Sequence, residues 1–350
     1  MISTKLTQLL LVGDVRESLK ELPDQSVHCC VTSPPYWGLR DYGHGGQIGL
    51  EQTPDQYIKE LVAVFREVKR VLRDDGTLWL NIGDSYSSIR DGKTSTFEGT
   101  PIKHKDLVGI PWMLAFALRA DGWYLRQDII WHKPNPMPES VTDRCTKSHE
   151  YIFLLTKQPN YYFDSKAIEE DAKTKAGATW QERKAAGATA GNVIVGDGTR
   201  NGTQRVVHGK GVTSNLTRQD GKRNKRSVWA VATRPLKIAH FATFPPALIE
   251  PCILAGCPEG GTVLDPFFGA GTTGLVAQQY GRGWIGIELN PEYAEIAKAR
   301  IGAHQLKQIN LTRHGKTLRH TSKRPTKPSY LQTDLTKRSS ECHNASTNHY

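Results

Sequence analysis

Short apolar runs alternate along the chain with segments whose apolar residues recur every three or four positions. A run of about four to six apolar residues predicts a buried strand, and the longer spacing predicts an amphipathic helix. The predicted strands cover residues 9–12, 27–32, 77–82, 125–131, 151–156, 261–265 and 284–288. The predicted helices cover residues 15–22, 54–72, 110–120 and 275–280. Because strands and helices alternate, the pattern predicts an α/β fold around a mostly parallel sheet.

Prolines mark two of the helices. Thr53-Pro54-Asp55 has the residue types that start a helix, with a capping hydroxyl followed by proline in the first turn. Pro251 instead falls inside the helix that Pro245 or Pro246 opens. Since proline lacks a backbone N–H and its ring crowds the preceding turn, we expect this helix to kink or break.

A diproline loop follows the strand at 27–32, where the chain reads Thr-Ser-Pro-Pro-Tyr-Trp. The two prolines stiffen the backbone and hold Ser33 extended. A hydroxyl, free carbonyls and the ring of Tyr36 therefore gather at a strand end. Such acceptors can bind an amino group, and the tyrosine can stack on a flat ring. The loop predicts a site for an amine-bearing aromatic ring, with a surface turn as the alternative.

A glycine-rich turn lies near the other end of the chain. The strand at 261–265 ends in Asp265 and leads through Pro-Phe-Phe-Gly-Ala-Gly-Thr-Thr-Gly into a helix. This order is typical of nucleotide sites, and the glycines match the spacing of the dinucleotide fingerprint. An aspartate at this position would repel a pyrophosphate, which favours a cationic cofactor such as S-adenosylmethionine over NAD. Glu288 ends the next strand, where an acid can bind ribose hydroxyls. Two capping acids in an ordinary sheet are the alternative.

Together the motifs TSPPYW and DPFFGAGTTG resemble those of DNA methyltransferases that methylate N4 of cytosine or N6 of adenine. Their order along the chain resembles the circularly permuted β group of this family. The likeness covers roughly residues 8–165 and 227–301. It implies a Rossmann-like methyltransferase fold dependent on S-adenosylmethionine, with a mostly parallel seven-stranded sheet and helices on both faces.

The resemblance also implies roles for single residues. The Ser33 side chain and the Pro34 carbonyl would hold the target amine, while Tyr36, and Trp37 as a second ring, would stack on a flipped base. The implied catalytic residues are Ser33, Pro34, Pro35 and Tyr36. The implied cofactor-binding residues are Asp14, Thr243, Asp265, Phe267, Gly269, Gly271 and Glu288.

Within that set, each acid has a different partner. Asp265 is expected beside the methionine ammonium, Glu288 at the ribose hydroxyls and Asp14 at the adenine amine. Phe267 and Thr243 would form walls of the pocket. We favour cytosine N4 because serine before the two prolines is commoner among cytosine enzymes of this family, and adenine N6 is the alternative. Relatives that methylate RNA or protein usually carry Asn-Pro-Pro-Tyr, which this chain lacks.

The net charge of +11 comes from two polar segments. Residues 166–226 hold 13 Lys and Arg against 6 Asp and Glu, and residues 302–350 hold 9 against 2. The remainder of the chain has 24 against 27 and is nearly neutral. Basic segments of this kind favour a polyanion partner, so we expect double-stranded DNA, with phosphate contacts from Arg223, Lys225 and Arg226.

These observations predict four regions. Residues 1–165 form the target-amine half of a catalytic domain, and residues 227–301 form its cofactor-binding half. Residues 166–226 form a basic target-recognition insertion that orders on DNA, and residues 302–350 form a disordered basic tail. A cognate restriction endonuclease is a possible second partner implied by the resemblance.

Other classes of protein are less compatible with the sequence. A nicotinamide-dependent oxidoreductase would leave Asp265 and the diproline loop unexplained, and a non-catalytic DNA-binding protein would not need both motifs. The six cysteines lack disulfide or metal spacing, which indicates a reducing compartment and no bound metal. The apolar stretch at residues 9–12 is too short for a signal peptide or a membrane span, so we expect a cytoplasmic protein.

Overall fold

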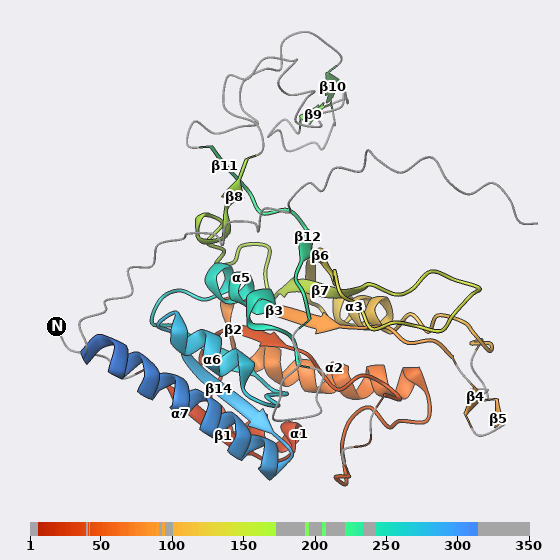
Figure 1. Cartoon of the computed structure of the whole chain (residues 1–350), viewed down its shortest axis with the longest axis horizontal. Coiled ribbons are helices and arrows are strands. Elements are labelled where there is room, and N and C mark those ends of the chain that lie inside the picture. The colour runs from red at the N-terminus through yellow and green to blue at the C-terminus, as the bar shows by residue number, and fades with distance from the viewer. Residues whose placement is uncertain are drawn as a thin grey trace, which may run out of the picture. The chain divides into compact units, whose positions relative to one another are not determined.

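An eight-stranded β-sheet with helices on both faces forms the centre of the computed structural model (Figure 1). The structure describes residues 6–39, 41, 43–87, 89–90, 93–94, 101–172, 193–195, 205–207, 221–233 and 243–313. The strand order across the sheet is β1-β14-β13-β2-β3-β7-β6-β12. All eight strands run in one direction except β7, which is antiparallel to β3 and β6. The expected mostly parallel α/β sheet is therefore confirmed.

The strands of the sheet have the following bounds: β1 Gln8–Val12, β2 Val27–Thr32, β3 Leu72–Ile82, β6 Tyr124–His132, β7 His149–Thr156, β12 Val228–Ala230, β13 Thr262–Asp265 and β14 Gly283–Glu288. Three short antiparallel pairs lie outside it: β4 Ile89–Arg90 with β5 Lys93–Thr94, β8 Glu170–Asp171 with β11 Lys222–Arg223, and β9 Val193–Val195 with β10 Arg205–Val207.

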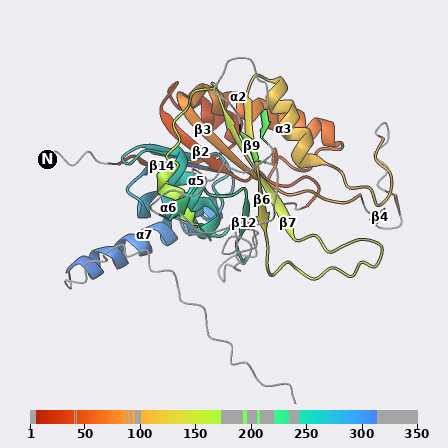
Figure 2. The same cartoon turned by 90° about the horizontal axis from the view of Figure 1, so that it is seen from above.

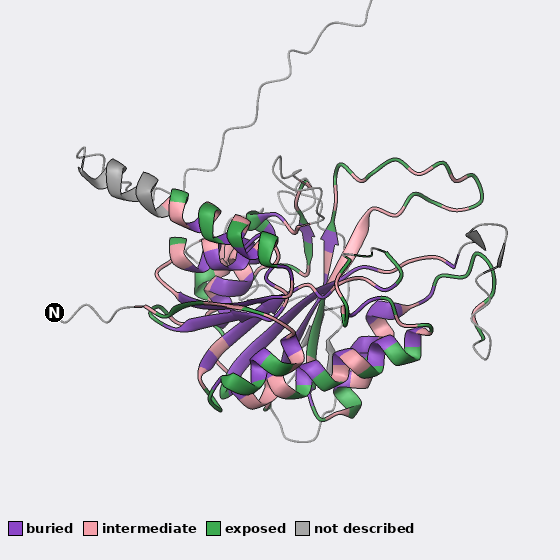
Figure 3. Cartoon of the chain, turned by 90° about the horizontal axis from the view of Figure 1, so that it is seen from below, coloured by how far each residue is buried: buried purple, intermediate pink, exposed green. Residues whose placement is uncertain are grey.

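The helices form two layers, one on each face of the sheet (Figure 3). Helices α1, α2 and α3 pack against one hydrophobic core, and α5, α6 and α7 pack against the other. Their bounds are α1 Val15–Ser18, α2 Pro54–Val71, α3 Ile110–Ala120, α5 Pro246–Gly256, α6 Thr272–Gln279 and α7 Pro291–Arg313, with single 3-10 turns at η1 Leu19–Glu21 and η2 Lys166–Ile168.

Helix α2 shows how the sequence pattern produces this packing. The Thr53 side chain caps it by accepting a hydrogen bond from the Gln56 backbone N–H at 3.2 Å, and Pro54 occupies the first turn. Its apolar positions recur at helical spacing and are all buried: Tyr57, Ile58, Leu61, Val64, Phe65, Val68 and Val71. Burying each large side chain contributes about 1.5–3 kcal/mol, so this face holds α2 on the sheet.

Two expectations about elements were wrong, and a third is narrowed. The sheet has eight strands rather than seven, because the short segment β12 pairs in parallel with β6 and adds a further edge. Helix α5 does not break at Pro251, which was one of the two expected outcomes there, and its buried side chains pack against α6 and the sheet. The expected helix at 15–22 is instead the short α1 followed by η1.

The chain end also differs from the expectation. Helix α7 continues to Arg313, past the boundary at residue 301 where a disordered tail was predicted to begin. The described residues from 6 to 305 belong to one compact unit. The tail beyond residue 313, and most of the predicted insertion at 166–226, lie outside the described residues.

The sheet order brings the two sequence motifs together. Strand β13, which carries Asp265, pairs with β2, which leads into the diproline loop. The pairing is parallel, with Leu264 opposite Cys30, so both strands end on the same side of the sheet. In open α/β sheets, ligands bind at the carboxyl ends of the strands. The two motifs, which lie far apart in the chain, therefore face one site.

Candidate active site

A cavity of about 800 Å³ opens at the carboxyl ends of the central strands. This volume lies within the range of small-molecule sites, which is roughly 300–1,000 Å³. Most residues proposed from the sequence line it: Asp14, Ser33, Pro34, Pro35, Tyr36, Thr243, Asp265, Phe267, Gly269 and Glu288. The fold therefore brings both halves of the predicted site into one pocket.

Asp265 is the most deeply buried acid of this pocket, with 1% of its surface exposed. Its carboxylate accepts hydrogen bonds from the hydroxyls of Thr32 and Thr273, both at 2.6 Å, and from the Phe267 backbone N–H at 3.1 Å. Burial raises the pKa of Asp265 to about 6, although the three donors favour its ionised form. A carboxylate offers about four acceptor positions, so one remains for a ligand.

Glu288 closes the glycine-rich turn from the neighbouring strand. Its carboxylate accepts the Gly269 backbone N–H at 2.7 Å and the Asn290 backbone N–H at 2.9 Å. Burial raises the pKa of Glu288. Because the acid occupies a backbone donor of the turn, a phosphate would meet a carboxylate there instead of a free N–H. The donor set fits S-adenosylmethionine, which has no phosphate, and does not fit NAD.

Asp14 caps α1 and is bound by its neighbour Arg16. One carboxylate oxygen accepts the Arg16 backbone N–H at 2.8 Å, and the other accepts the guanidinium at 2.6 Å. The guanidinium also donates to the Gly46 carbonyl at 2.7 Å. The arginine lowers the pKa of Asp14, so this carboxylate is held ionised in a fixed orientation at the pocket wall.

Gly271 differs from the other proposed cofactor residues because it does not line the cavity. It caps α6 with φ +76° and faces α7, where an added Cβ would lie 2.8 Å from the Cβ of Ala297. The second glycine of the fingerprint is thus explained by close helix packing and a left-handed backbone.

The diproline loop presents its polar groups unequally to the pocket. The Pro35 carbonyl is already bound by the Tyr57 hydroxyl of α2 at 2.7 Å. The Pro34 carbonyl receives no hydrogen bond from the described residues, so its acceptor positions remain open to a ligand. Trp37, expected as a second stacking ring, instead lies in the core with 8% exposure and donates to the Glu51 carbonyl at 2.9 Å.

A polar network behind Tyr36 was missed by the sequence analysis. The Tyr36 hydroxyl donates to Glu150 at 2.6 Å, and the same carboxylate oxygen accepts from the Asn81 amide at 3.2 Å. Lys133 forms an ion pair with the other oxygen of Glu150. Gly83 lies beneath the ring, since a Cβ there would come within 2.6 Å of Tyr36 Cε2. The one sequence signal was an acid at the start of an otherwise apolar strand, β7.

Two more titratable groups of this wall are shifted towards their neutral forms. Burial lowers the pKa of Lys147, whose ammonium donates to the Asp84 carbonyl at 2.6 Å. Burial and the nearby Lys147 also lower the pKa of His149. Burial and Glu150 raise the pKa of Tyr36, so its phenol remains a hydrogen-bond donor at neutral pH.

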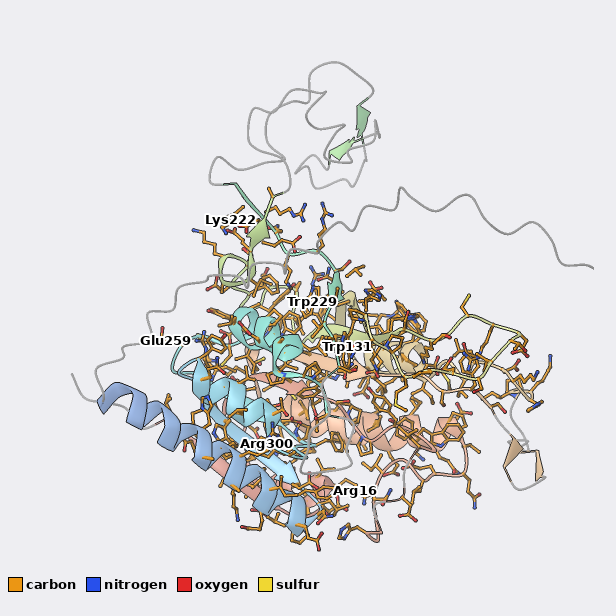
Figure 4. The ribbon with its side chains drawn as sticks, in the orientation of Figure 1. Arg16, Trp131, Lys222, Trp229, Glu259 and Arg300 are labelled. Carbon is orange, nitrogen blue, oxygen red and sulfur yellow. The ribbon has the colours of Figure 1, made fainter. Side chains whose placement is uncertain are left out.

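The predicted DNA contacts Arg223, Lys225 and Arg226, here called the basic cluster, lie in and after strand β11, which pairs with β8. Arg223 pairs with Glu170 at 2.9 Å, and Arg226 lies 3.9 Å from the same acid. The Lys225 ammonium lies 5.0 Å from the centre of the Trp229 ring. Trp229 lies opposite Trp131 on the next strand, and Trp131 lines the cavity (Figure 4).

Neither a metal site nor a membrane helix is found among the described residues. No group of three or more His, Cys, Asp or Glu side chains is placed to hold a metal ion there. Within the same residues, no helix is long and apolar enough to cross a membrane.

Comparison with known proteins shows the family. The model of a DNA methylase family of the N6/N4 type matches residues 27–299. The type II methyltransferase M.SmaI of Serratia marcescens is 48% identical over 305 residues, covering 83% of this chain and 90% of the relative. The type II methyltransferase M.Cfr9I of Citrobacter freundii is 47% identical over 315 residues, covering 86% and 90%.

Solved structures agree with this result. TTHA0409 of Thermus thermophilus, described as a putative DNA modification methylase and complexed with S-adenosylmethionine, superimposes with a TM-score of 0.53 at 27% identity, covering 85% of this chain and 94% of that one. The PvuII DNA methyltransferase, described as cytosine-N4-specific, gives a TM-score of 0.56 at 18% identity, covering 87% and 94%, and shows the shared fold. The chain therefore belongs to the N6/N4 DNA methylase family and is an S-adenosylmethionine-dependent DNA methyltransferase.

Proposed function

We propose that the chain methylates N4 of cytosine at a specific sequence in double-stranded DNA. The observation that carries the proposal is the joint pocket, in which the serine-diproline-tyrosine loop faces the acids of the cofactor side. Ser33 supports cytosine as the target, because the adenine enzymes that the sequence resembles more often have Asp or Asn at this position. Methylation of adenine N6 is the alternative.

The residues of the loop would activate and hold the base. The exocyclic amine of a base is a weak nucleophile because its lone pair is delocalised into the ring. Hydrogen bonds from its two N–H groups to Ser33 and the Pro34 carbonyl would favour a more tetrahedral nitrogen with a freer lone pair. Tyr36 would stack on the base, which must leave the duplex to reach this depth.

The cofactor residues would orient the methyl donor opposite the amine. S-adenosylmethionine supplies an electrophilic methyl group on its sulfonium. Asp265 would bind the methionine ammonium with its remaining acceptor position, Glu288 the ribose hydroxyls and Asp14 the adenine amine. Phe267 and Thr243 would form the walls. Positioning and electrostatics then account for the acceleration, and no covalent enzyme intermediate is needed.

The target base is tested by sequencing and by mass spectrometry. DNA from cells that express the chain is sequenced by a single-molecule method, which reports base and site together. Nucleosides from the same DNA should contain N4-methylcytosine. If N6-methyladenine appears instead, the cytosine proposal is wrong while the family assignment stands.

The catalytic loop is tested by substitution. Ser33→Ala removes the hydroxyl acceptor and should slow turnover, because the transition state loses about 1–3 kcal/mol of stabilisation. Removing the stacking ring in Tyr36→Ala should nearly abolish turnover, since stacking alone contributes about 1–3 kcal/mol. S-adenosylmethionine should bind both variants as it binds the parent. Parent rates in both variants would show that the loop is structural.

We also propose that residues 166–226 form the region that recognises the target sequence. Their basic charge and their position between the two catalytic halves support this role. Deleting residues 187–221 should erase sequence choice and leave cofactor affinity intact. Retained choice in the deletion variant would assign recognition to another loop. Because several relatives are type II methyltransferases, we further propose a cognate restriction endonuclease, whose cleavage the methylated DNA should resist.

A further inference from the structure

The loop between β6 and β7 carries an unusually exposed apolar side chain at the pocket. Met137 is 84% exposed, more than any other large hydrophobic residue among the described residues, and it lines the cavity. Figure 2 shows this loop extending outward from the ends of its two strands. An exposed apolar side chain beside a binding site commonly marks a contact with a partner.

The backbone that presents Met137 is stiff. Pro136 and Pro138 flank it and fix the local φ angles. On one side, the Asn135 side chain accepts the Thr233 backbone N–H at 2.9 Å and donates to the Thr233 carbonyl at 3.2 Å. The exposed position is therefore held in place, and Met137 does not fold back onto the core.

The other side of the loop is fixed as firmly. Glu139 pairs with Arg144 at 2.7 Å and accepts the Lys147 backbone N–H at 3.1 Å. The Arg144 guanidinium lies 3.8 Å from the centre of the Tyr86 ring. These contacts join the loop to the segment after β3, so the tip is ordered before DNA arrives and loses little entropy on binding.

A flipped base leaves a gap in the DNA stack. Proteins that unstack or kink DNA fill such gaps with apolar side chains, methionine among them. The thioether is flexible and polarisable, which suits contact with base faces on both sides. We propose that Met137 enters the gap left by the target base and stabilises the flipped state. This inference rests on the proposed base flipping.

The test compares two DNA duplexes. One contains the sequence identified by single-molecule sequencing with its target base paired, and the other has an abasic site opposite the target. Unpaired bases leave the stack more easily, so the second duplex needs less help from the protein. Single-turnover methylation rates are measured with saturating S-adenosylmethionine, together with the affinity for each duplex.

Met137→Ala should slow methylation of the paired duplex about tenfold, equal to about 1.4 kcal/mol. Its rate on the abasic duplex should stay within about twofold of the parent. Met137→Leu, which keeps the apolar volume, should restore the paired rate. Val228→Ala is the matched control, because Val228 is 61% exposed and does not line the cavity.

Three results would overturn the proposal. If Met137→Ala methylates the paired duplex at the parent rate, Met137 has no role in flipping. If Met137→Ala loses the same factor in rate on both duplexes, Met137 acts in a step other than flipping. Leu39 also lines the cavity and is 52% exposed. If Leu39→Ala, and not Met137→Ala, slows methylation of the paired duplex while sparing the abasic duplex, the role belongs to Leu39. If the parent methylates neither duplex, the proposed function itself fails and this inference fails with it.

Discussion

We expect the buried Asp265 to make cofactor binding depend on pH in a defined direction. Its pKa is raised to about 6 by burial, from an ordinary value of 3.8. A carboxylate binds an ammonium group when it is ionised, so binding competence is lost as the pH falls through about 6. The ammonium of the cofactor stays charged over this range, because ordinary α-amino groups have a pKa of about 7.7–8.0.

The magnitude follows from the competent fraction. With a pKa of about 6, about 9% of Asp265 is ionised at pH 5 and about 91% at pH 7, so the apparent affinity at pH 5 is about tenfold lower than at pH 7. With the ordinary pKa, about 94% would be ionised at pH 5 and the affinity would be nearly constant. The two cases differ by a factor of about ten in the dissociation constant.

Titration calorimetry between pH 5 and pH 7 measures this difference. Buffers of different ionisation enthalpy should also reveal close to one proton released per S-adenosylmethionine bound at pH 5. Asp265→Asn should bind weakly and without the inflection near pH 6. Thr273→Val removes a 2.6 Å hydrogen bond to the ionised form and should move the inflection to higher pH. A flat affinity profile in the parent would refute the assignment of Asp265 to the ammonium.

Three further predictions address the rest of the site. Tyr36→Phe should slow methylation about tenfold or more, because it removes one charge-assisted hydrogen bond of about 1.5–3 kcal/mol. Glu150→Gln should slow methylation at least as much, because it weakens the same hydrogen bond and also loses the ion pair with Lys133. The single-turnover rate of the double variant should be no lower than that of the slower single variant. Neutralising the basic cluster should flatten the slope of log DNA affinity against log salt concentration by about 0.9 for each phosphate contact that is lost. In the same assay, Glu170→Gln should strengthen DNA binding, because it releases Arg223 from its ion pair with Glu170. Gly271→Ala should destabilise the fold by about 1–3 kcal/mol in urea denaturation, because its Cβ would lie 2.8 Å from Ala297, and an unchanged midpoint would contradict that packing.

Much of the fold could be read from local patterns. The helical spacing in α2 and its Thr53 cap predicted that element closely, and the observed bounds of α3 agree with the expected 110–120. Residues at strand ends were also predictable, because acids and prolines that interrupt an apolar run mark the end of a buried strand. The positions of Asp265 and Glu288 at the carboxyl ends of β13 and β14 follow from that rule.

Interactions between distant segments could not be read in this way. Tyr36 and Glu150 are separated by 114 residues, and their hydrogen bond depends on the order β2-β3-β7 in the sheet. Trp37 directly follows Tyr36 but is buried in the core, because neighbouring side chains point to different sides of the chain. No local pattern distinguishes these two rings.

The sequence by itself determined seven of the eight strands of the sheet and helices α2 and α3, together with where those strands end and which chemical groups lie at those ends. These properties depend on neighbours within a few positions, which the periodicity records. Tertiary structure alone decided that β12 adds an eighth strand, that Gly271 faces α7 and that Arg223 is paired with Glu170. Each of these outcomes depends on which distant segments the fold places side by side. A polar group or a backbone surface pairs with whichever partner lies beside it in the folded chain, and that partner is not encoded by its neighbours in sequence.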